Sequence, residues 1–281
     1  MGMSHRFRFA TCNEVFENWK FHDACKAIRR AGYQGIEVAP FTLSDNPAAL
    51  TADQRRQFRS IIQAEDLMFV GLHWLLVKPE GMHVTTDDAQ LRARSWQYIR
   101  DLIDLCADLG DGGVMVFGSP KQRSATGGVS VEDATARFID GIASVASQAA
   151  ERGVTMLVEA LPSAQSNVVT SLDEAARIVR EISSPAVRTM FDTHNAVEEA
   201  EPHATLIDRH FDLIRHVHVN EMDGRHPGTG DYDFKPMFQA LMARGYKGWV
   251  SLEAFDFSMG AEKIVQDTIA YLKSEAAAVS K

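Results

Sequence analysis

Eight short apolar runs, rich in β-branched residues, recur along the whole chain and alternate with longer amphipathic stretches. The runs cover residues 6–13, 35–40, 67–74, 113–120, 155–162, 187–195, 214–221 and 248–255. Apolar residues recur at helical spacing over 21–32, 87–110, 131–153 and 171–182 between them. Eight strand–helix units in series predict a parallel sheet closed into a (β/α)₈ barrel. A doubly wound open sheet is the alternative, but CNEVFENW follows the first run where that fold often has a glycine-rich turn.

The length fits one such barrel, and the composition excludes some classes of binding partner. A chain of 281 residues with no long linker predicts a single domain over 1–281. The net charge of −9 argues against binding nucleic acid or an anionic membrane. The chain contains no run of 18 apolar residues, so we expect no membrane span. The N-terminus lacks the apolar core of a secretory signal. The three cysteines form no CxxC pair, which favours a reduced, cytoplasmic protein.

Polar side chains gather at the ends of the predicted strands, where a barrel of this kind builds its active site. They are Glu37, His73, Glu159, Asp192, His194, His216, His218, Glu221 and Glu253. Each lies inside or just after an apolar run, where a buried carboxylate is costly unless it is paired or binds a metal. Four consecutive strands, the fifth to the eighth, bring an acid or an imidazole to the same end of the barrel.

This set of side chains suits a divalent metal ion. Carboxylate oxygens with an imidazole are ligands for Mn²⁺, Co²⁺, Mg²⁺ or Zn²⁺ and differ from the thiolates of a structural zinc site. His216 and His218 share one strand face, because side chains alternate along a strand. Any one of these residues alone is more often a hydrogen-bonded core residue than a ligand. The constellation from four strands therefore carries more weight than any member of it.

Four segments resemble one known family when they are taken in order. They are VEALP at 158–162, FDTHN at 191–195, HVHVNEMDGRHPGTGDYDF at 216–234 and SLEAF at 251–255. The chain is similar to the xylose isomerase-like TIM barrels, which include ketose 3-epimerases, hydroxypyruvate isomerase and inosose dehydratase. Endonuclease IV is a more distant member, but the fourth run ends in GSPKQR and lacks the histidine that its metal cluster needs. The resemblance implies a TIM barrel.

The resemblance also implies the metal site and the acid–base residues. It implies that one divalent ion (Mn, Co, Mg or Zn) is held by Glu159, Asp192, His218 and Glu253. It implies that Glu159 and Glu253 are also catalytic, as acid and base on opposite faces of the substrate. A metal that chelates a carbonyl and its neighbouring hydroxyl acidifies the C–H between them, so the predicted reaction passes through an enediolate.

The substrate residues match the family pattern less closely. His194 lies one residue before the family's histidine position, Arg225 one residue after its arginine, and Gln165 where it usually has glutamate. We also expect His73 and Glu221 to bind substrate, with a core histidine as the alternative for His73. The PGTG turn at 227–230 is either a backbone nest for phosphate or a plain turn, which we favour.

The predicted function is a metal-dependent sugar isomerase or epimerase, with manganese as one expected metal. Its substrate is a ketose or related α-hydroxycarbonyl. The alternative is a lyase or dehydratase that acts on a keto-sugar or keto-inositol with the same scaffold. A non-catalytic sugar-binding barrel is a third reading, but it would not require both Glu159 and Glu253. The expected partner is a small sugar, and assembly into a homo-oligomer stays open.

Overall fold

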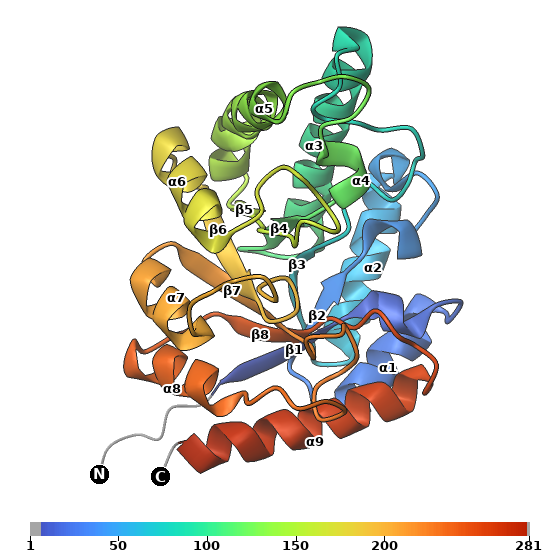
Figure 1. Ribbon diagram of the computed structural model, residues 1–281. Helices are drawn as coiled ribbons and strands as arrows, with labels where there is room; N and C mark the ends of the chain where they lie inside the picture. The colour runs from blue at the N-terminus through green and yellow to red at the C-terminus, as the bar shows by residue number, and fades with distance from the viewer. Residues whose placement is uncertain (1–6, 280–281) are drawn as a thin grey trace.

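The computed structural model describes residues 7–279 and shows a closed barrel of parallel strands in the order β1 to β8 (Figure 1). The strands are β1 (Arg8–Cys12), β2 (Gly35–Val38), β3 (Met68–Leu72), β4 (Val114–Phe117), β5 (Thr155–Val158), β6 (Val187–Asp192), β7 (Ile214–Val219) and β8 (Trp249–Leu252). β8 pairs with β1 and closes the barrel. The predicted (β/α)₈ TIM barrel is confirmed, and each strand falls within one of the eight apolar runs.

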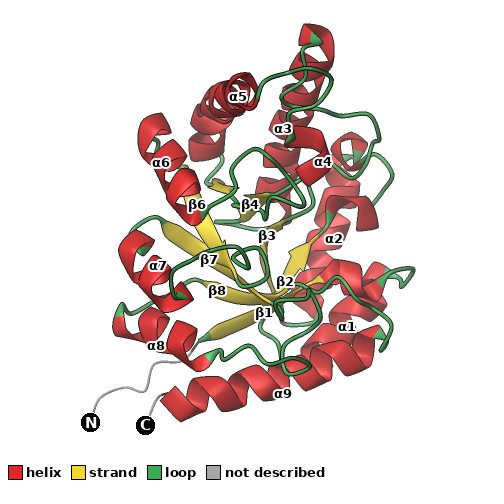
Figure 2. Ribbon diagram, in the orientation of Figure 1, coloured by secondary structure: helices red, strands yellow, loops and turns green. Residues whose placement is uncertain are grey.

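Helices surround the barrel, as the red ribbons around the yellow strands show in Figure 2. They are α1 (Phe21–Ala31), α2 (Ala52–Ala64), α3 (Ala89–Leu109), α4 (Pro120–Arg123), α5 (Val131–Glu151), α6 (Leu172–Ile182), α7 (His203–His210), α8 (Lys235–Ala243) and α9 (Ala261–Val279). Three short 3₁₀ turns, Asn13–Phe16, Pro40–Thr42 and Pro47–Ala49, follow β1 and β2. α9 packs against both α8 and α1, so the outer ring closes where the barrel closes.

Local sequence signals explain where these helices begin and end. Ser130 caps α5 by accepting a hydrogen bond from the Asp133 amide, and Ser171 caps α6 in the same way from Glu174. Such caps satisfy amides that have no partner within the helix. α1 ends at Gly32, whose φ of 103° lies in the left-handed region that glycine adopts without strain. These signals set the bounds of the helices, while the packing of their apolar faces on the barrel stabilises them.

The interior of the barrel divides into apolar and polar parts. Ala10, Val70 and Trp249 form one buried apolar cluster, and Val116, Leu157 and Met190 form another. Polar residues lie nearer the carboxyl ends of the strands: Cys12 and Asp192 are the last residues of β1 and β6. Glu159 and Glu253 follow directly after β5 and β8. The apolar layers thus support a polar layer at the end where the βα loops begin.

Two irregularities in strand register position the polar layer. The pairing of β6 with β7 shifts between Thr189 and Met190, which brings Asp192 opposite His218. The pairing of β2 with β3 shifts just before Glu37. A bulge of this kind changes which way the following side chains face, and bulges are common beside active sites.

None of the helices within residues 7–279 has the length and apolar character that a membrane-spanning helix needs.

Candidate active site

Four side chains from four consecutive strands converge at the carboxyl end of the barrel. Glu159, Asp192, His218 and Glu253 each offer one ligand atom, and these four atoms all lie within 4.8 Å of one another. All four residues are buried. We call this set the ligand quartet. It is the set that the family resemblance implied, and its three carboxylates and one imidazole match the ligands that divalent ions take from proteins.

The electrostatics of the ligand quartet also favour a cation. Burial, together with the negative charges of Glu253 and Asp192, raises the pKa of Glu159 to about 8. Burial also raises the pKa of Glu253, although the neighbouring His218 opposes that rise. Burial acts on Asp192 in the same direction, but the hydrogen bond and charge of His218 outweigh it and lower the pKa. Three crowded carboxylates of this kind fit a divalent ion, which would stabilise the ionised form of each.

Neighbouring residues hold the carboxylates of the ligand quartet in place. Asn195 donates from Nδ2 to Glu159 Oε1 at 3.0 Å, and its backbone amide donates to Asp192 Oδ1 at 2.7 Å. Trp74 donates from its indole Nε1 to Glu253 Oε1 at 2.8 Å. Sequence reasoning missed Asn195, although its position three residues after Asp192 was the available signal. These bonds limit the movement of both candidate acid–base residues, which catalysis requires.

Close packing against β4 also fixes Glu159. A Cβ atom placed on Gly118 would lie 2.2 Å from Glu159 Oε2. Any side chain at this position would therefore collide with the carboxylate. Gly118 directly follows β4, so the glycine leaves the room that the Glu159 side chain occupies.

Glu37 explains why β7 carries two histidines on one inward face. Its Oε2 lies 2.8 Å from His216 Nε2, and its Oε1 lies 3.0 Å from His218 Nε2. Burial raises the pKa of Glu37, but the charges of His218 and His216 outweigh burial and hold it well below its usual range. His218 thereby turns Nδ1 toward the ligand quartet, where Glu253 Oε2 lies at 3.1 Å. A carboxylate behind a ligating histidine commonly fixes its ring in this way.

A cavity of about 490 Å³ opens beside the ligand quartet. Glu159, Glu253 and Asn195 form its polar floor. Trp74 and Phe255 also line it, with parallel rings whose centres lie 6.1 Å apart. A cavity that combines an apolar wall with a few converging polar groups is typical of small-molecule sites. Both candidate acid–base residues therefore border the space that a substrate would occupy.

Two of the predicted substrate residues lie together near this cavity. Gln165 lines it, and its Nε2 lies 3.4 Å from His194 Nε2. His194 is held in turn by a contact of 2.8 Å between its Nδ1 and the Met222 carbonyl. His73 lies elsewhere: it is fully buried, does not line the cavity, and contacts Glu14 Oε2 through Nε2 at 2.6 Å.

The other two predicted substrate residues belong to the loop after β7. Glu221 is buried, and its carboxylate accepts hydrogen bonds from the amides of Gly228 and Tyr232. An internal carboxylate thus accepts the hydrogen bond of the Gly228 amide in the PGTG turn, which a phosphate would otherwise use. Arg225 donates from Nε to Asp223 Oδ2 at 2.7 Å. Neither Glu221 nor Arg225 is among the residues that line the cavity.

Fold and site together define a (β/α)₈ barrel with a candidate metal centre at the carboxyl ends of β5 to β8. The protein belongs to the xylose isomerase-like TIM barrel family, whose model matches residues 25–275. This confirms the family that the strand-end motifs indicated.

Epimerases and a dehydratase are among the proteins to which the chain is similar. The chain is 22% identical over 246 residues to fructoselysine 3-epimerase of Shigella flexneri, across 83% of this chain and 84% of that one. It is 26% identical to inosose dehydratase of Geobacillus thermodenitrificans, across 47% of this chain and about half, 53%, of the relative. The structure of L-ribulose 3-epimerase superposes with a TM-score of 0.84 at 20% identity and covers 98% of this chain and 96% of its own. At that identity the structural likeness shows the shared fold.

Proposed function

We propose that the protein is a divalent-metal-dependent sugar isomerase or epimerase that acts on a ketose or a related α-hydroxycarbonyl compound. The observation that carries the proposal is the position of Glu159 and Glu253, which belong to the ligand quartet and also line the cavity. A purely binding barrel would not need two carboxylates there. The relatives named as epimerases of fructoselysine and L-ribulose support the same class of reaction.

The proposed reaction moves a proton between carboxylates and substrate carbon. A divalent ion held by the ligand quartet would supply Lewis acidity, which makes the C–H beside a carbonyl more acidic. One of the two glutamates removes that proton and gives an enediolate, and the other returns a proton. Return to the opposite face of the same carbon inverts it, whereas return to the adjacent carbon interconverts aldose and ketose.

The surrounding residues prepare the two glutamates for this work. The bonds from Asn195 to Glu159 and from Trp74 to Glu253 fix one oxygen of each carboxylate. Glu159 Oε2 is left to serve the metal or the substrate, whereas Glu253 Oε2 lies 3.1 Å from His218 Nδ1, the imidazole nitrogen of the ligand quartet. Trp74 and Phe255 offer an apolar wall on which the C–H face of a sugar can pack. His194 and Gln165 are proposed to bind substrate hydroxyls at the cavity edge, and His73, Glu221 and Arg225 remain predictions for this role.

A lyase on the same scaffold is the second candidate. The similarity to inosose dehydratase favours it, because dehydration would use the same enolate and then expel a β-leaving group. His194, which contacts the cavity residue Gln165, is the proposed acid for that group. The two reactions differ in the product and share the first proton transfer.

Incubation with Mn²⁺ and a panel of ketoses and keto-glycosides in D₂O tests the proposal. Exchange of substrate hydrogen with solvent, without loss of water, would support isomerisation or epimerisation. A new enone or released water would support the lyase. No exchange with any substrate at saturating Mn²⁺, Co²⁺, Mg²⁺ or Zn²⁺ would contradict both. A preference for manganese and a cytoplasmic location are part of this proposal.

A further inference from the structure

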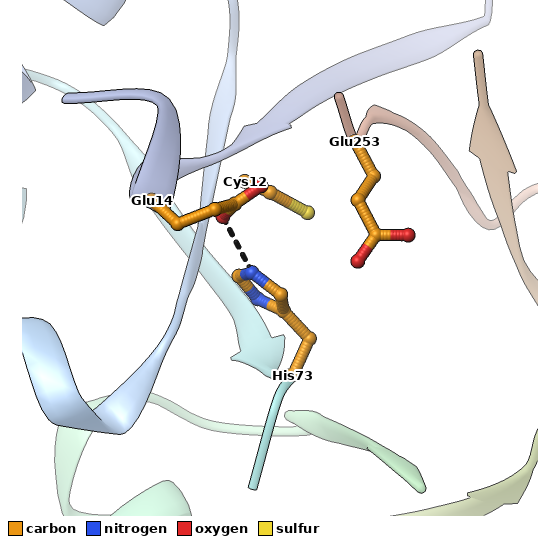
Figure 3. A group of neighbouring side chains, drawn as sticks. All are labelled: Cys12, Glu14, His73 and Glu253. Atoms are coloured by element: carbon orange, nitrogen blue, oxygen red, sulfur yellow. Dashed lines mark hydrogen bonds and ion pairs between the residues drawn. The ribbon is translucent and has the colours of Figure 1, made fainter. Parts of the chain in front are cut away.

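A second group of potential metal ligands lies on the side of the barrel formed by β1 and β3. Cys12, Glu14, His73 and Glu253 each offer one ligand atom, and these atoms also lie within 4.8 Å of one another. We call this set the inner cluster, because its first three members are buried and none of them lines the cavity. Figure 3 shows the Cys12 thiol pointing toward the Glu253 carboxylate, with the His73 ring turned toward Glu14.

Two polar atoms of the inner cluster have no hydrogen-bond partner. Glu14 Oε1 and His73 Nδ1 are both buried without a hydrogen bond, although Glu14 Oε2 and His73 Nε2 lie 2.6 Å apart and His73 Nδ1 lies 3.8 Å from Glu37 Oε1. A buried carboxylate oxygen that makes no hydrogen bond is destabilising, so native proteins seldom leave one without a hydrogen-bond partner, a water or an ion. A cation is the partner that the charge of this oxygen favours.

The excess of buried negative charge at this end of the barrel also favours a bound cation. Five buried carboxylates lie here: Glu14, Glu37, Glu159, Asp192 and Glu253. Within residues 7–279, none of them forms an ion pair with a lysine or arginine; their ion pairs are with histidines only. The fully buried Arg123 donates to backbone carbonyls, including that of Glu159, at 2.8 Å. A single divalent ion in the ligand quartet leaves the carboxylates of Glu14 and Glu37 to their histidines alone.

Cys12 also lies near Glu37 and His218, and those three residues form another compact group. That group is the weaker candidate, because both oxygens of Glu37 are already bound by His216 and His218 at 2.8 and 3.0 Å. A metal there would have to break both bonds. In the inner cluster only Glu253 has both oxygens engaged, by Trp74 and His218, whereas Glu14 Oε1 and His73 Nδ1 make no hydrogen bond.

We propose that the inner cluster is a second cation site for a borderline transition-metal ion such as Zn²⁺ or Co²⁺. Its donors are one sulfur, one imidazole nitrogen and two carboxylate oxygens, a set that selects these ions over Mg²⁺ or Ca²⁺. Glu253 belongs to both sets and would bridge the two ions, as carboxylates commonly do in two-metal sites. This proposal does not depend on the proposed isomerase activity, because it is argued from the ligand atoms alone.

Entry of the ion must displace a proton. Burial and the nearby charge of Glu37 raise the pKa of the Cys12 thiol to about 12, so the thiol is neutral in the metal-free protein. The ion would replace the thiol proton and bind Glu14 Oε1 and His73 Nδ1, so the hydrogen bond between Glu14 Oε2 and His73 Nε2 can stay in place. We expect the ligand quartet to fill first, because Glu159 and Glu253 line the cavity whereas Cys12, Glu14 and His73 do not.

Titration of the metal-free protein with Co²⁺ tests the second site without any assay of activity. A bond between cobalt and a thiolate gives a charge-transfer band in the ultraviolet, which carboxylate and imidazole ligands do not give. We expect this band to develop with the second equivalent of Co²⁺, and elemental analysis to find two ions per chain. Cys12→Ser and His73→Gln should each abolish the band and the second equivalent.

Cys25→Ser with Cys106→Ser is the matched control, because both are buried free cysteines outside the inner cluster. That double variant should keep the band in full. Absence of the band in the wild-type protein at several equivalents of Co²⁺ would overturn the proposal. A thiolate band that develops with the first equivalent alone would overturn the assignment of two sites. Both of these outcomes come from the wild-type protein, so a variant that fails to fold leaves the test intact.

Discussion

The two sides of the barrel mouth use the same residue types in opposite ways. On the side of β5 to β8, Glu159 and Glu253 line the cavity and crowd with Asp192. On the side of β1 to β3, Glu14 and Glu37 do not line the cavity, and each is bound to a histidine within 2.8 Å. Access to the cavity, rather than residue type, separates the two groups. Under the proposed function, the carboxylates that border the cavity exchange protons with substrate, whereas Glu14 and Glu37 are paired with histidines behind them.

His218 links the two sides. Its Nδ1 faces the ligand quartet and its Nε2 faces Glu37. We therefore expect a substitution of Glu37 to change the affinity of the ligand quartet for a metal ion without changing a contact to the substrate. The following predictions test this division, beginning with the largest expected effect.

Glu159→Gln and Glu253→Gln should each lower turnover about a hundredfold to ten-thousandfold at saturating metal, because general acid–base help has that value. The volume of the side chain is nearly conserved, so the fold should persist. Turnover is measured on the substrate that the D₂O panel identifies. The exposed Glu132→Gln is the control and should leave turnover unchanged. Near-normal turnover of Glu253→Gln would make Glu253 a metal ligand only.

His218→Ala should weaken binding of the first metal ion more than His216→Ala does. Both imidazoles contact Glu37, but only His218 belongs to the ligand quartet. Loss of a direct ligand should exceed the roughly 10–100-fold loss that follows removal of an outer partner. Isothermal titration with Mn²⁺ measures both affinities. Equal losses in the two variants would show that both histidines play the same part.

Glu37→Gln should weaken Mn²⁺ binding by about 10–100-fold and leave turnover at saturating metal nearly unchanged. The amide keeps one acceptor oxygen, so it can hold only one of the two histidines as the carboxylate does. A loss of Mn²⁺ affinity without a loss of turnover would show that Glu37 orients His218 and does not act on substrate. A loss of turnover that excess metal does not restore would place Glu37 among the groups that act on substrate.

The smallest predicted effect is the dependence of metal affinity on pH. Glu159 has a pKa of about 8 in the metal-free protein and must lose its proton to bind the ion. Affinity should therefore fall by about tenfold per pH unit as the pH drops below 8, and level off above it. In Glu159→Gln, metal binding should release about one proton fewer, so the dependence of affinity on pH should be less steep by about tenfold per pH unit. A wild-type affinity that stays constant between pH 6 and 8 would contradict the assignment.

Much of the architecture could be read from local patterns. Each strand is a short apolar run, and helices such as α5 and α6 show helical periodicity and serine caps, so neighbouring residues determine these elements. The position of Asp192 and Glu253 at strand ends then identified them as site candidates, because closure of the barrel brings all such ends together. The family resemblance added the prediction that Glu159, Asp192, His218 and Glu253 hold a metal ion, and these residues do converge.

The sequence by itself determined the strands, the helices and the polar strand ends, because those depend on residues close together in the chain. Only the tertiary structure decided which polar groups meet. Glu14 contacts His73 across 59 positions, and Trp74 contacts Glu253 across 179. The PGTG loop binds its own Glu221, although its pattern suits a phosphate equally well. Such pairs depend on strand register, on bulges such as that before Asp192, and on how far each side chain lies from the cavity. These are properties of the closed barrel that no local window of sequence contains.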